Sequence, residues 1–238
     1  MSESQSPQKQ PALRPRDAAT LILVRRDAAQ PRVLMGKRHE SHKFMPGKYV
    51  FPGGRVDLAD CRVQPSRPLE QAVAGKLLSQ MRGRPSEARA QGLAMAAVRE
   101  TFEEVGYVVG TPGSIATTRS SAWSQFHQTG HGADLSGLKL LARAITPPGR
   151  PRRFDTRFFI ADASVIANPD SPLTPETDEL LTPHWVTIEE ARLLDLPWIT
   201  GQILKRLEAL LERRDALSCQ HDCTFQFMRG KDWQYVTL

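Results

Sequence analysis

The most informative segment of the chain is Arg99-Glu100-Thr101-Phe102-Glu103-Glu104-Val105-Gly106-Tyr107. On a helix that turns by about 100° per residue, its three glutamates lie within about 100° of one another on one face. The opposite face carries the apolar residues Met95, Val98, Phe102 and Val105, which predicts that this side packs against a core. Ser86 is a plausible N-cap, and Gly106 stands where a left-handed cap is expected. The sequence therefore predicts an amphipathic helix from Ser86 to Val105 with a carboxylate face.

The glutamates Glu100, Glu103 and Glu104 would repel one another, at a cost of about 0.2–0.5 kcal/mol for each neighbouring pair. A hard cation reverses the sign of that interaction, and Mg²⁺ and Mn²⁺ prefer oxygen ligands and retain waters that serve in catalysis. Arg99 and Glu103 are four residues apart and can form an ion pair on the flank of the helix. A solvated acidic helix face is the alternative interpretation of the same pattern.

Segments around this helix have the periodicity of an α+β domain with a helix between strands. Expected strands are Ala18–Val24 and Arg32–Met35, joined as a hairpin, then Lys48–Phe51, Arg153–Ala161 and His184–Val186, with a hairpin over Thr224–Leu238. Expected helices are Leu69–Met81, Ile188–Leu194 and Trp198–Arg214. Residues 40–48 and 169–183 are expected to be loops.

Two glycines follow the expected strand at Lys48–Phe51, in the sequence Phe51-Pro52-Gly53-Gly54. Glycine lets the backbone approach another group closely. A free carbonyl at this point would supply a further oxygen ligand, which strengthens the interpretation of the acidic helix as a metal site.

These motifs resemble the Nudix hydrolases, whose motif is a Gly, five residues, a Glu, seven residues, then Arg-Glu-U-x-Glu-Glu-x-Gly-U with U apolar. The second half matches Arg99 to Tyr107, although Thr101 stands where an apolar residue is usual. In the first half only Gly54 matches. The motif has a Glu six residues after the Gly and eight residues before the Arg, but this chain has Asp60 at the first of these positions and Gln91 at the second. Gly54 and Arg99 are 45 residues apart instead of 14, so an insertion of 31 residues splits the motif.

An insertion at this place resembles the long-insertion branch of the family, which contains peroxisomal coenzyme A diphosphatases. The segments that carry this resemblance are Phe44–Gly47, Val50–Gly54, Val56–Asp60 and Arg153–Phe159. It implies an α/β/α sandwich around a mixed β-sheet, with a helical insertion inside the motif at about residues 61–90.

The resemblance also implies the site. Glu100, Glu103 and Glu104 would be ligands of Mg²⁺ or Mn²⁺ with the carbonyl of Gly53 nearby, and Arg99 would orient them. Glu103 or Glu104 would accept the proton of the attacking water. Glu176 and Glu179 are alternatives for that role, because Nudix enzymes often use a carboxylate from the corresponding loop.

The expected reaction is metal-assisted hydrolysis of a phosphoanhydride bond in a small-molecule nucleotide. Coenzyme A or an acyl-CoA is the leading substrate, giving adenosine 3′,5′-bisphosphate and a 4′-phosphopantetheine product, with Arg38, Lys43 and Gly54 as substrate contacts. The coenzyme A signature is matched only partly, so ADP-ribose or a dinucleotide such as NADH remains an alternative. A domain that only binds a nucleotide or RNA is the second alternative.

Bulk properties set the remaining expectations. The chain has 238 residues, a formal net charge of +6 and a pI near 9.5, a basic excess that favours polyanionic ligands. Residues 1–16 are expected to be a disordered lead-in and residues 17–238 a single domain, with a C-terminal helix and hairpin at about 198–238. No apolar run suits a membrane span or a secretory signal, so we expect a cytoplasmic protein with no nucleic acid or membrane partner. Homodimerisation is left open.

Overall fold

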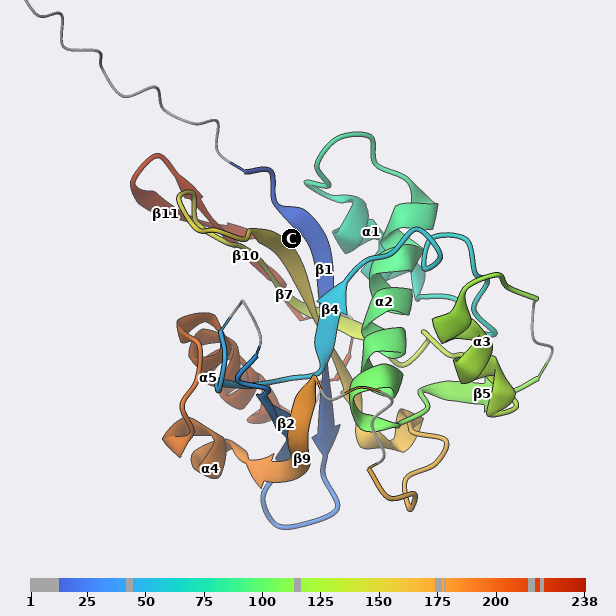
Figure 1. Cartoon of the computed structure of the whole chain (residues 1–238). Helices are drawn as coiled ribbons and strands as arrows, with labels where there is room; N and C mark the ends of the chain where they lie inside the picture. The colour runs from blue at the N-terminus through green and yellow to red at the C-terminus, as the bar shows by residue number, and fades with distance from the viewer. Residues whose placement is uncertain are drawn as a thin grey trace, which may run out of the picture.

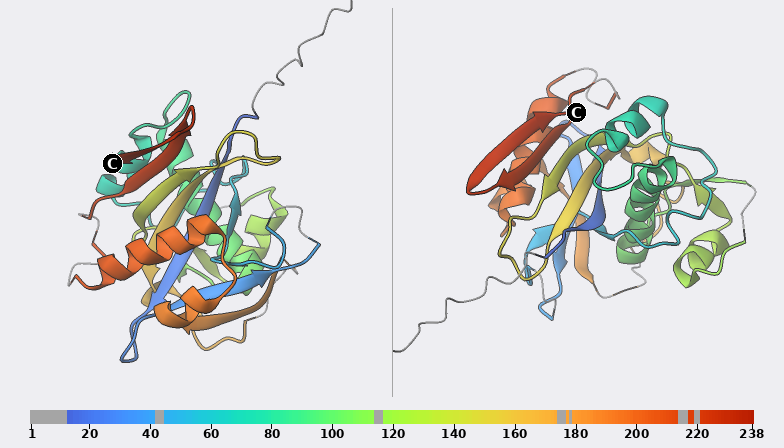
Figure 2. Two further views of the ribbon diagram at one scale, coloured as in Figure 1. Left: turned by 90° about the vertical axis from the view of Figure 1, so that its left-hand side faces the viewer. Right: turned by 90° about the horizontal axis from the view of Figure 1, so that it is seen from above.

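A computed structural model describes residues 13–41, 45–113, 117–173, 177, 179–213, 217–218 and 221–238. In this part of the chain nine strands form one mixed sheet with helices on both faces, as Figures 1 and 2 show. The predicted α/β/α sandwich is therefore confirmed. No helix within these residues is both long and apolar enough to cross a bilayer.

The large sheet contains β1 (Arg16–Arg25), β2 (Arg32–Arg38), β3 (Tyr49–Val50), β4 (Gly53–Arg55), β7 (Lys139–Ile145), β8 (Phe154–Asp162), β9 (Leu180–Thr187), β10 (Thr224–Arg229) and β11 (Asp232–Thr237). A separate pair is formed by β5 (Gly110–Pro112) and β6 (His131–Ala133). The helices are α1 (Gln71–Leu78), α2 (Glu87–Val105), α3 (Ser121–Gln128), α4 (Ile188–Leu193) and α5 (Trp198–Leu211), with the short 3₁₀ turn η1 (Ala163–Val165).

Strand β1 lies at the centre of the sheet, whose order is β11-β10-β7-β8-β1-β2-β3, with β4 paired to β1 and β9 paired to β2. It runs parallel to β8 along its whole length, from Arg16 opposite Phe154 to Val24 opposite Asp162. A strand covered by helices on both faces must be apolar at successive positions. The residues from 18 to 24 satisfy this requirement, since all except Thr20 are buried apolar side chains.

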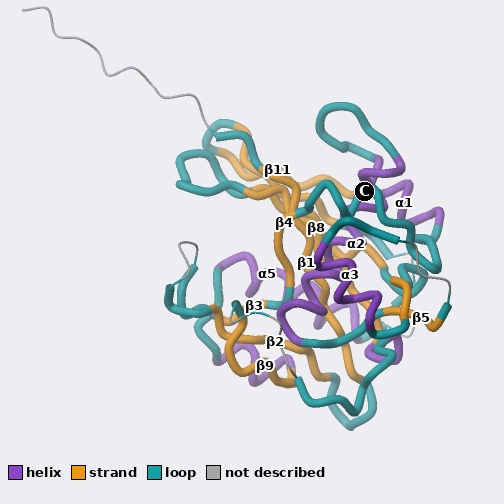
Figure 3. Tube along the Cα trace, turned by 45° about the vertical axis from the view of Figure 1, so that its right-hand side comes forward, coloured by secondary structure: helices purple, strands orange, loops and turns teal. Residues whose placement is uncertain are grey.

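Two hydrophobic cores lie on opposite faces of β1. Leu21 and Leu23 point to the core shared with α1, α2 and α3, whereas Ile22 and Val24 point to the core shared with α5. Figure 3 shows α1, α2 and α3 gathered on their side of the sheet. The carboxylate helix is thus fixed by its apolar face, as the sequence pattern predicts.

Both predicted caps of this helix are confirmed. The hydroxyl of Ser86 accepts a hydrogen bond from the backbone N–H of Arg89, and Gly106 has a φ of 80° in the left-handed region. The hairpin of β1 and β2 is antiparallel as expected, and so is the hairpin of β10 and β11. The predicted helix at 69–81 is shorter, because α1 covers only Gln71–Leu78.

Other expectations were wrong or incomplete. The glycine turn after Phe51 is strand β4, because a backbone without side chains fits against β1: a Cβ on Gly53 would lie 2.4 Å from the carbonyl oxygen of Ala19. The expected loop at 169–183 ends early, since β9 begins at Leu180. The elements β5, β6, β7 and α3 were not predicted. Strand β1 begins at Arg16, inside the expected lead-in.

The first testable prediction concerns Gly92 of α2, where the insertion meets the helix. A Cβ on Gly92 would lie 2.4 Å from Sγ of Cys61 and 3.2 Å from that residue's backbone N. We therefore expect Gly92→Ala to reduce the free energy of unfolding by about 1–3 kcal/mol through overpacking. Chemical denaturation measures the change.

The matched control is Gly201 in α5, where an added Cβ meets no atom within 4 Å. Gly201→Ala is expected to raise the free energy of unfolding by about 0.5–1 kcal/mol, since alanine loses less backbone entropy in a helix. A destabilising effect of the same size at both positions would contradict the close contact between α2 and Cys61.

Candidate active site

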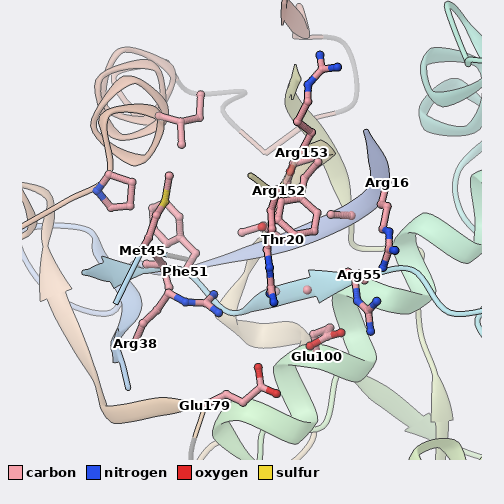
Figure 4. Close-up of a pocket in the computed structure, with 18 of the residues that line it drawn as sticks. Arg16, Thr20, Arg38, Met45, Phe51, Arg55, Glu100, Arg152, Arg153 and Glu179 are labelled. Carbon is pink, nitrogen blue, oxygen red and sulfur yellow. The ribbon is translucent and has the colours of Figure 1, made fainter. Parts of the chain in front are cut away.

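A pocket of about 870 Å³ lies over the face of the sheet formed by β1, β4 and β8. This volume is within the range of about 300–1,000 Å³ typical of small-molecule sites. Alternate residues of the three strands form its floor, and these are Arg16, Ala18, Thr20, Gly53, Arg55, Phe154, Thr156 and Phe158. Figure 4 shows side chains from the sheet, from α2 and from the loop before β8 directed toward this space.

Strand β4 brings the glutamates of α2 to the edge of the pocket. The backbone N–H of Gly53 donates to Oε2 of Glu104 at 2.8 Å. A Cβ on Gly54 would lie 2.4 Å from the carboxylate carbon of Glu100. Gly54 is therefore required by the close approach of the half-buried Glu100 carboxylate, which agrees with the expected close approach of the backbone here, whereas a carbonyl ligand at this point stays a prediction.

Arg99 lies at the centre of the acidic cluster. Its Nη1 donates to Oε1 of Glu100 at 3.0 Å and to Oε2 of Glu103 at 2.6 Å. Its Nη2 donates to the backbone carbonyl of Arg55 at 2.9 Å. The predicted Arg99–Glu103 pair is present, and the same guanidinium ties the helix to β4.

Asp60 is a further component of this arrangement, although sequence reasoning had treated it as a departure from the motif. Its fully buried carboxylate accepts from Nε of Arg99 at 2.9 Å and from Nη2 of Arg99 at 3.0 Å. It also accepts from the indole N–H of Trp123 in α3 at 2.8 Å. The available signal was the spacing from Gly54, because an Asp there keeps the carboxylate of the usual Glu on a shorter side chain.

Nearby positive charge does not compensate for the burial of the three carboxylates on α2. Burial raises the pKa of Glu100 to about 7, with Arg99 opposing the shift and Glu103 adding to it. Burial and repulsion from Glu100 raise the pKa of Glu104 well above its usual range. Burial also raises the pKa of Glu103, against the attraction of Arg99.

This chemistry fits a hard divalent cation, because all the donors are oxygens and added positive charge would relieve the repulsion. Within the described residues, however, no three His, Cys, Asp or Glu side chains are gathered into a ready-made metal centre. Glu103 is turned toward Arg99, whereas Glu104 is held by Gly53. The metal roles of Glu100, Glu103, Glu104 and Gly53 therefore remain predictions.

Most of the other predicted residues can be placed. Glu179 is exposed and lines the same pocket, with its carboxylate facing the α2 side in Figure 4. Arg38 and Gly54 also line the pocket, and the charge of Arg38 partly opposes the rise that burial and Glu100 cause in the pKa of Glu104. Lys43 and Glu176 lie outside the residues that the structure describes.

The second testable prediction is a pH dependence of the metal-free protein. Glu100 has an ordinary pKa of 4.5 when unfolded and about 7 when folded. A raised folded pKa contributes stability that is complete below the unfolded value and is lost as the pH rises through the folded value. We expect the melting temperature in EDTA to fall as the pH is raised from 5 to 8, measured by scanning calorimetry.

The control for this prediction is Glu100→Gln, which removes the titrating group. The difference in melting temperature between this variant and the wild type should widen with pH, and Mg²⁺ should stabilise the wild type more at pH 8 than at pH 5. Parallel pH profiles of the two proteins would show that Glu100 does not titrate in this range.

A curated relative and a solved structure to which this chain is similar are both named as Nudix hydrolases. No protein-family model matches the chain. A Caenorhabditis elegans protein named as a nudix hydrolase is 29% identical over 187 residues, which are 74% of this chain and 52% of that protein. This chain thus spans about half the length of that curated relative. The crystal structure of a NUDIX hydrolase from Alicyclobacillus acidocaldarius superposes with a TM-score of 0.59 at 27% identity, covering 81% of this chain and 90% of the other.

Proposed function

We infer the reaction from the premise that this chain belongs to the Nudix hydrolase superfamily. We propose that it hydrolyses the phosphoanhydride bond of a nucleoside diphosphate derivative with the help of Mg²⁺ or Mn²⁺. The observation that carries the proposal is the presence of Glu100 and Glu103 in the wall of a pocket large enough for a nucleotide, with the buried Glu104 beside them.

Glu100, Glu103 and Glu104 would hold the cation, with the backbone at Gly53 close by. When bound, the cation neutralises the diphosphate oxygens and lowers the pKa of a water. The oxygen of this water would attack phosphorus, forming a new P–O bond while the bond from that phosphorus to the bridging oxygen breaks. The leaving phosphate keeps the bridging oxygen and the electron pair.

The chain's own residues position these groups. Arg99 fixes Glu100 and Glu103 through Nη1, and Asp60 fixes Arg99 from the buried side. A carboxylate must accept the proton of the attacking water. Glu179 suits this role because it is exposed at the pocket, opposite the α2 glutamates.

Coenzyme A or an acyl-CoA is the substrate that we propose within this class. The resemblance to the long-insertion branch supports it, and so does the position of Arg38 at the pocket beside Phe51. A guanidinium at this place suits a diphosphate, because its fork matches phosphate oxygens. The products would be adenosine 3′,5′-bisphosphate and a 4′-phosphopantetheine species.

The test is to compare coenzyme A, an acyl-CoA, ADP-ribose and NADH side by side with Mg²⁺ or Mn²⁺, and to separate the products by chromatography. Cleavage of the coenzyme A compounds to adenosine 3′,5′-bisphosphate would support the proposed substrate. Cleavage of ADP-ribose or NADH alone would retain the phosphoanhydride chemistry and reject coenzyme A.

A further inference from the structure

Three arginines at the pocket have guanidinium groups that form no hydrogen bond or ion pair with any residue that the structure describes. Arg16 comes from the start of β1, Arg55 from the end of β4, and Arg152 from the loop before β8. Across the part of the chain that the structure describes, no hydrogen bond or ion pair involves the guanidinium of Arg16, Arg55 or Arg152. By contrast, the guanidinium of Arg153 is hydrogen-bonded within the protein, since it donates to the backbone carbonyls of Thr146 and Leu13.

Strand register explains why two of these charges are neighbours. Arg55 lies opposite Ala18 in the antiparallel pairing of β4 with β1. Arg16 is two residues before Ala18 and therefore points to the same face of the sheet. Figure 4 shows the side chains of Arg16 and Arg55 next to each other, with Arg152 reaching toward the pocket from the other side.

Like charges at neighbouring positions of a sheet destabilise it unless an opposite charge lies between them. Glu100, Glu103 and Asp57 line the same pocket. Among the described residues, however, none of these three carboxylates forms an ion pair with Arg16 or Arg55. The arrangement is therefore complementary to an anion brought by a ligand.

The opposite end of the pocket has different chemistry. Figure 4 shows the apolar side chains of Met45 and Phe51 there, with the guanidinium of Arg38 beside them. The glutamates of α2 and Glu179 lie between this apolar end and the arginines, as Figure 4 shows for Glu100 and Glu179. A ligand that spans the pocket thus meets carboxylates near its middle, apolar surface with Arg38 at one end, and Arg16 and Arg55 at the other.

We propose that Arg16, Arg55 and Arg152 bind a phosphate monoester that the substrate carries in addition to the scissile diphosphate. This inference rests on the proposed function, because it assigns a subsite of the same pocket. Guanidinium groups suit a phosphate monoester through paired N–H···O hydrogen bonds. The substrate class is accordingly a nucleoside diphosphate derivative with a third phosphate on its ribose.

Binding without turnover tests the subsite separately from the reaction. In EDTA, calorimetric titration with adenosine 3′,5′-bisphosphate, adenosine 2′,5′-bisphosphate and AMP compares ligands that differ by one phosphate. We expect the wild type to bind one bisphosphate about tenfold more tightly than AMP. The double variant Arg16→Gln/Arg55→Gln should lose that preference, and Arg152→Gln should reduce it.

The matched control is Arg229→Gln, which removes the same charge from an exposed position at the end of β10. It should leave the preference unchanged, while melting temperatures show that all variants are folded. Which bisphosphate binds more tightly identifies the 3′ or 2′ phosphate. Equal binding of AMP and both bisphosphates by the wild type would overturn the subsite, as would an equal loss of affinity in Arg229→Gln.

Rates of hydrolysis then distinguish the proposed phosphate subsite from the proposed hydrolase function. Coenzyme A is compared with 3′-dephospho-coenzyme A, and NADPH with NADH. A kcat/KM about tenfold higher for the phosphorylated member of a pair, lost in the double variant, supports the subsite. Hydrolysis without any such preference overturns the subsite and retains the proposed function. Selective binding of a bisphosphate without hydrolysis of any substrate would support the subsite and overturn the proposed function.

Discussion

Glu104→Gln is expected to lower kcat/KM for phosphoanhydride hydrolysis by about 10²–10⁴-fold, the range for a group that takes part directly in the reaction. The substitution removes one negative charge from the face of α2 that would hold the cation. It preserves shape, because the amide oxygen of Gln can still accept the hydrogen bond that Gly53 donates to Oε2 at 2.8 Å. Steady-state kinetics at saturating Mg²⁺ measure the loss.

The same substitution should have the opposite effect on the stability of the metal-free protein. Glu104 is only 2% exposed, and burial together with repulsion from Glu100 raises its pKa well above the usual range. A neutral side chain avoids that cost, so the melting temperature in EDTA should be equal to or higher than that of the wild type. A variant that lost activity because it unfolded would contradict a direct role.

Asp60→Asn is expected to reduce the free energy of unfolding by about 3–5 kcal/mol, the cost of breaking a buried ion pair from one side. Asp60 is fully buried and Arg99 is 4% exposed, so water cannot replace the lost partner. One of the two Asp60 oxygens that accept from Arg99 would be replaced by an amide NH₂ group, which donates instead. For a chain of this size the melting temperature should fall by about 10 °C, measured by scanning calorimetry.

Trp123→Phe is the matched control, because it keeps the ion pair of Asp60 with Arg99 and removes the indole N–H that donates to Asp60, together with part of a buried ring. Its cost should be smaller than that of Asp60→Asn, at about 1–3 kcal/mol for the lost hydrogen bond and the smaller ring. Activity measured well below the melting temperature should fall in Asp60→Asn, as Arg99 no longer holds Glu100 and Glu103 in place. Equal stability of Asp60→Asn and the wild type would contradict the positioning role.

Much of the fold was predictable where local signals decide the structure. Helix α2 carries an apolar face, a serine N-cap and a glycine C-cap within its own sequence, and all three are present in the structure. The central strand was predictable because its residues are almost all apolar. The pair of Arg99 and Glu103 follows from helical spacing alone.

The remaining features depend on contacts between segments far apart in the chain. Strand β4 exists because its glycines fit against β1, which no local propensity predicts. Asp60 joins the site because the insertion returns to α2 beside Trp123 of α3. Arg16 and Arg152 become neighbours of the pocket only through the parallel pairing of β1 with β8. The sequence pointed to Arg38, Lys43 and the run from Arg150 to Arg153 as candidates for a basic rim, but it gave no sign that Arg16 and Arg55 lie at the same pocket.

The most direct test of the central claim is the rate of phosphoanhydride hydrolysis as Mg²⁺ is titrated from EDTA to saturation, for the wild type and Glu104→Gln together. We expect no turnover in EDTA, a saturable rise with Mg²⁺ in the wild type, and a rate lower by about 10²–10⁴-fold in the variant. Turnover in EDTA, or equal rates of the two proteins at every Mg²⁺ concentration, would contradict the assignment of the α2 glutamates as the catalytic metal site.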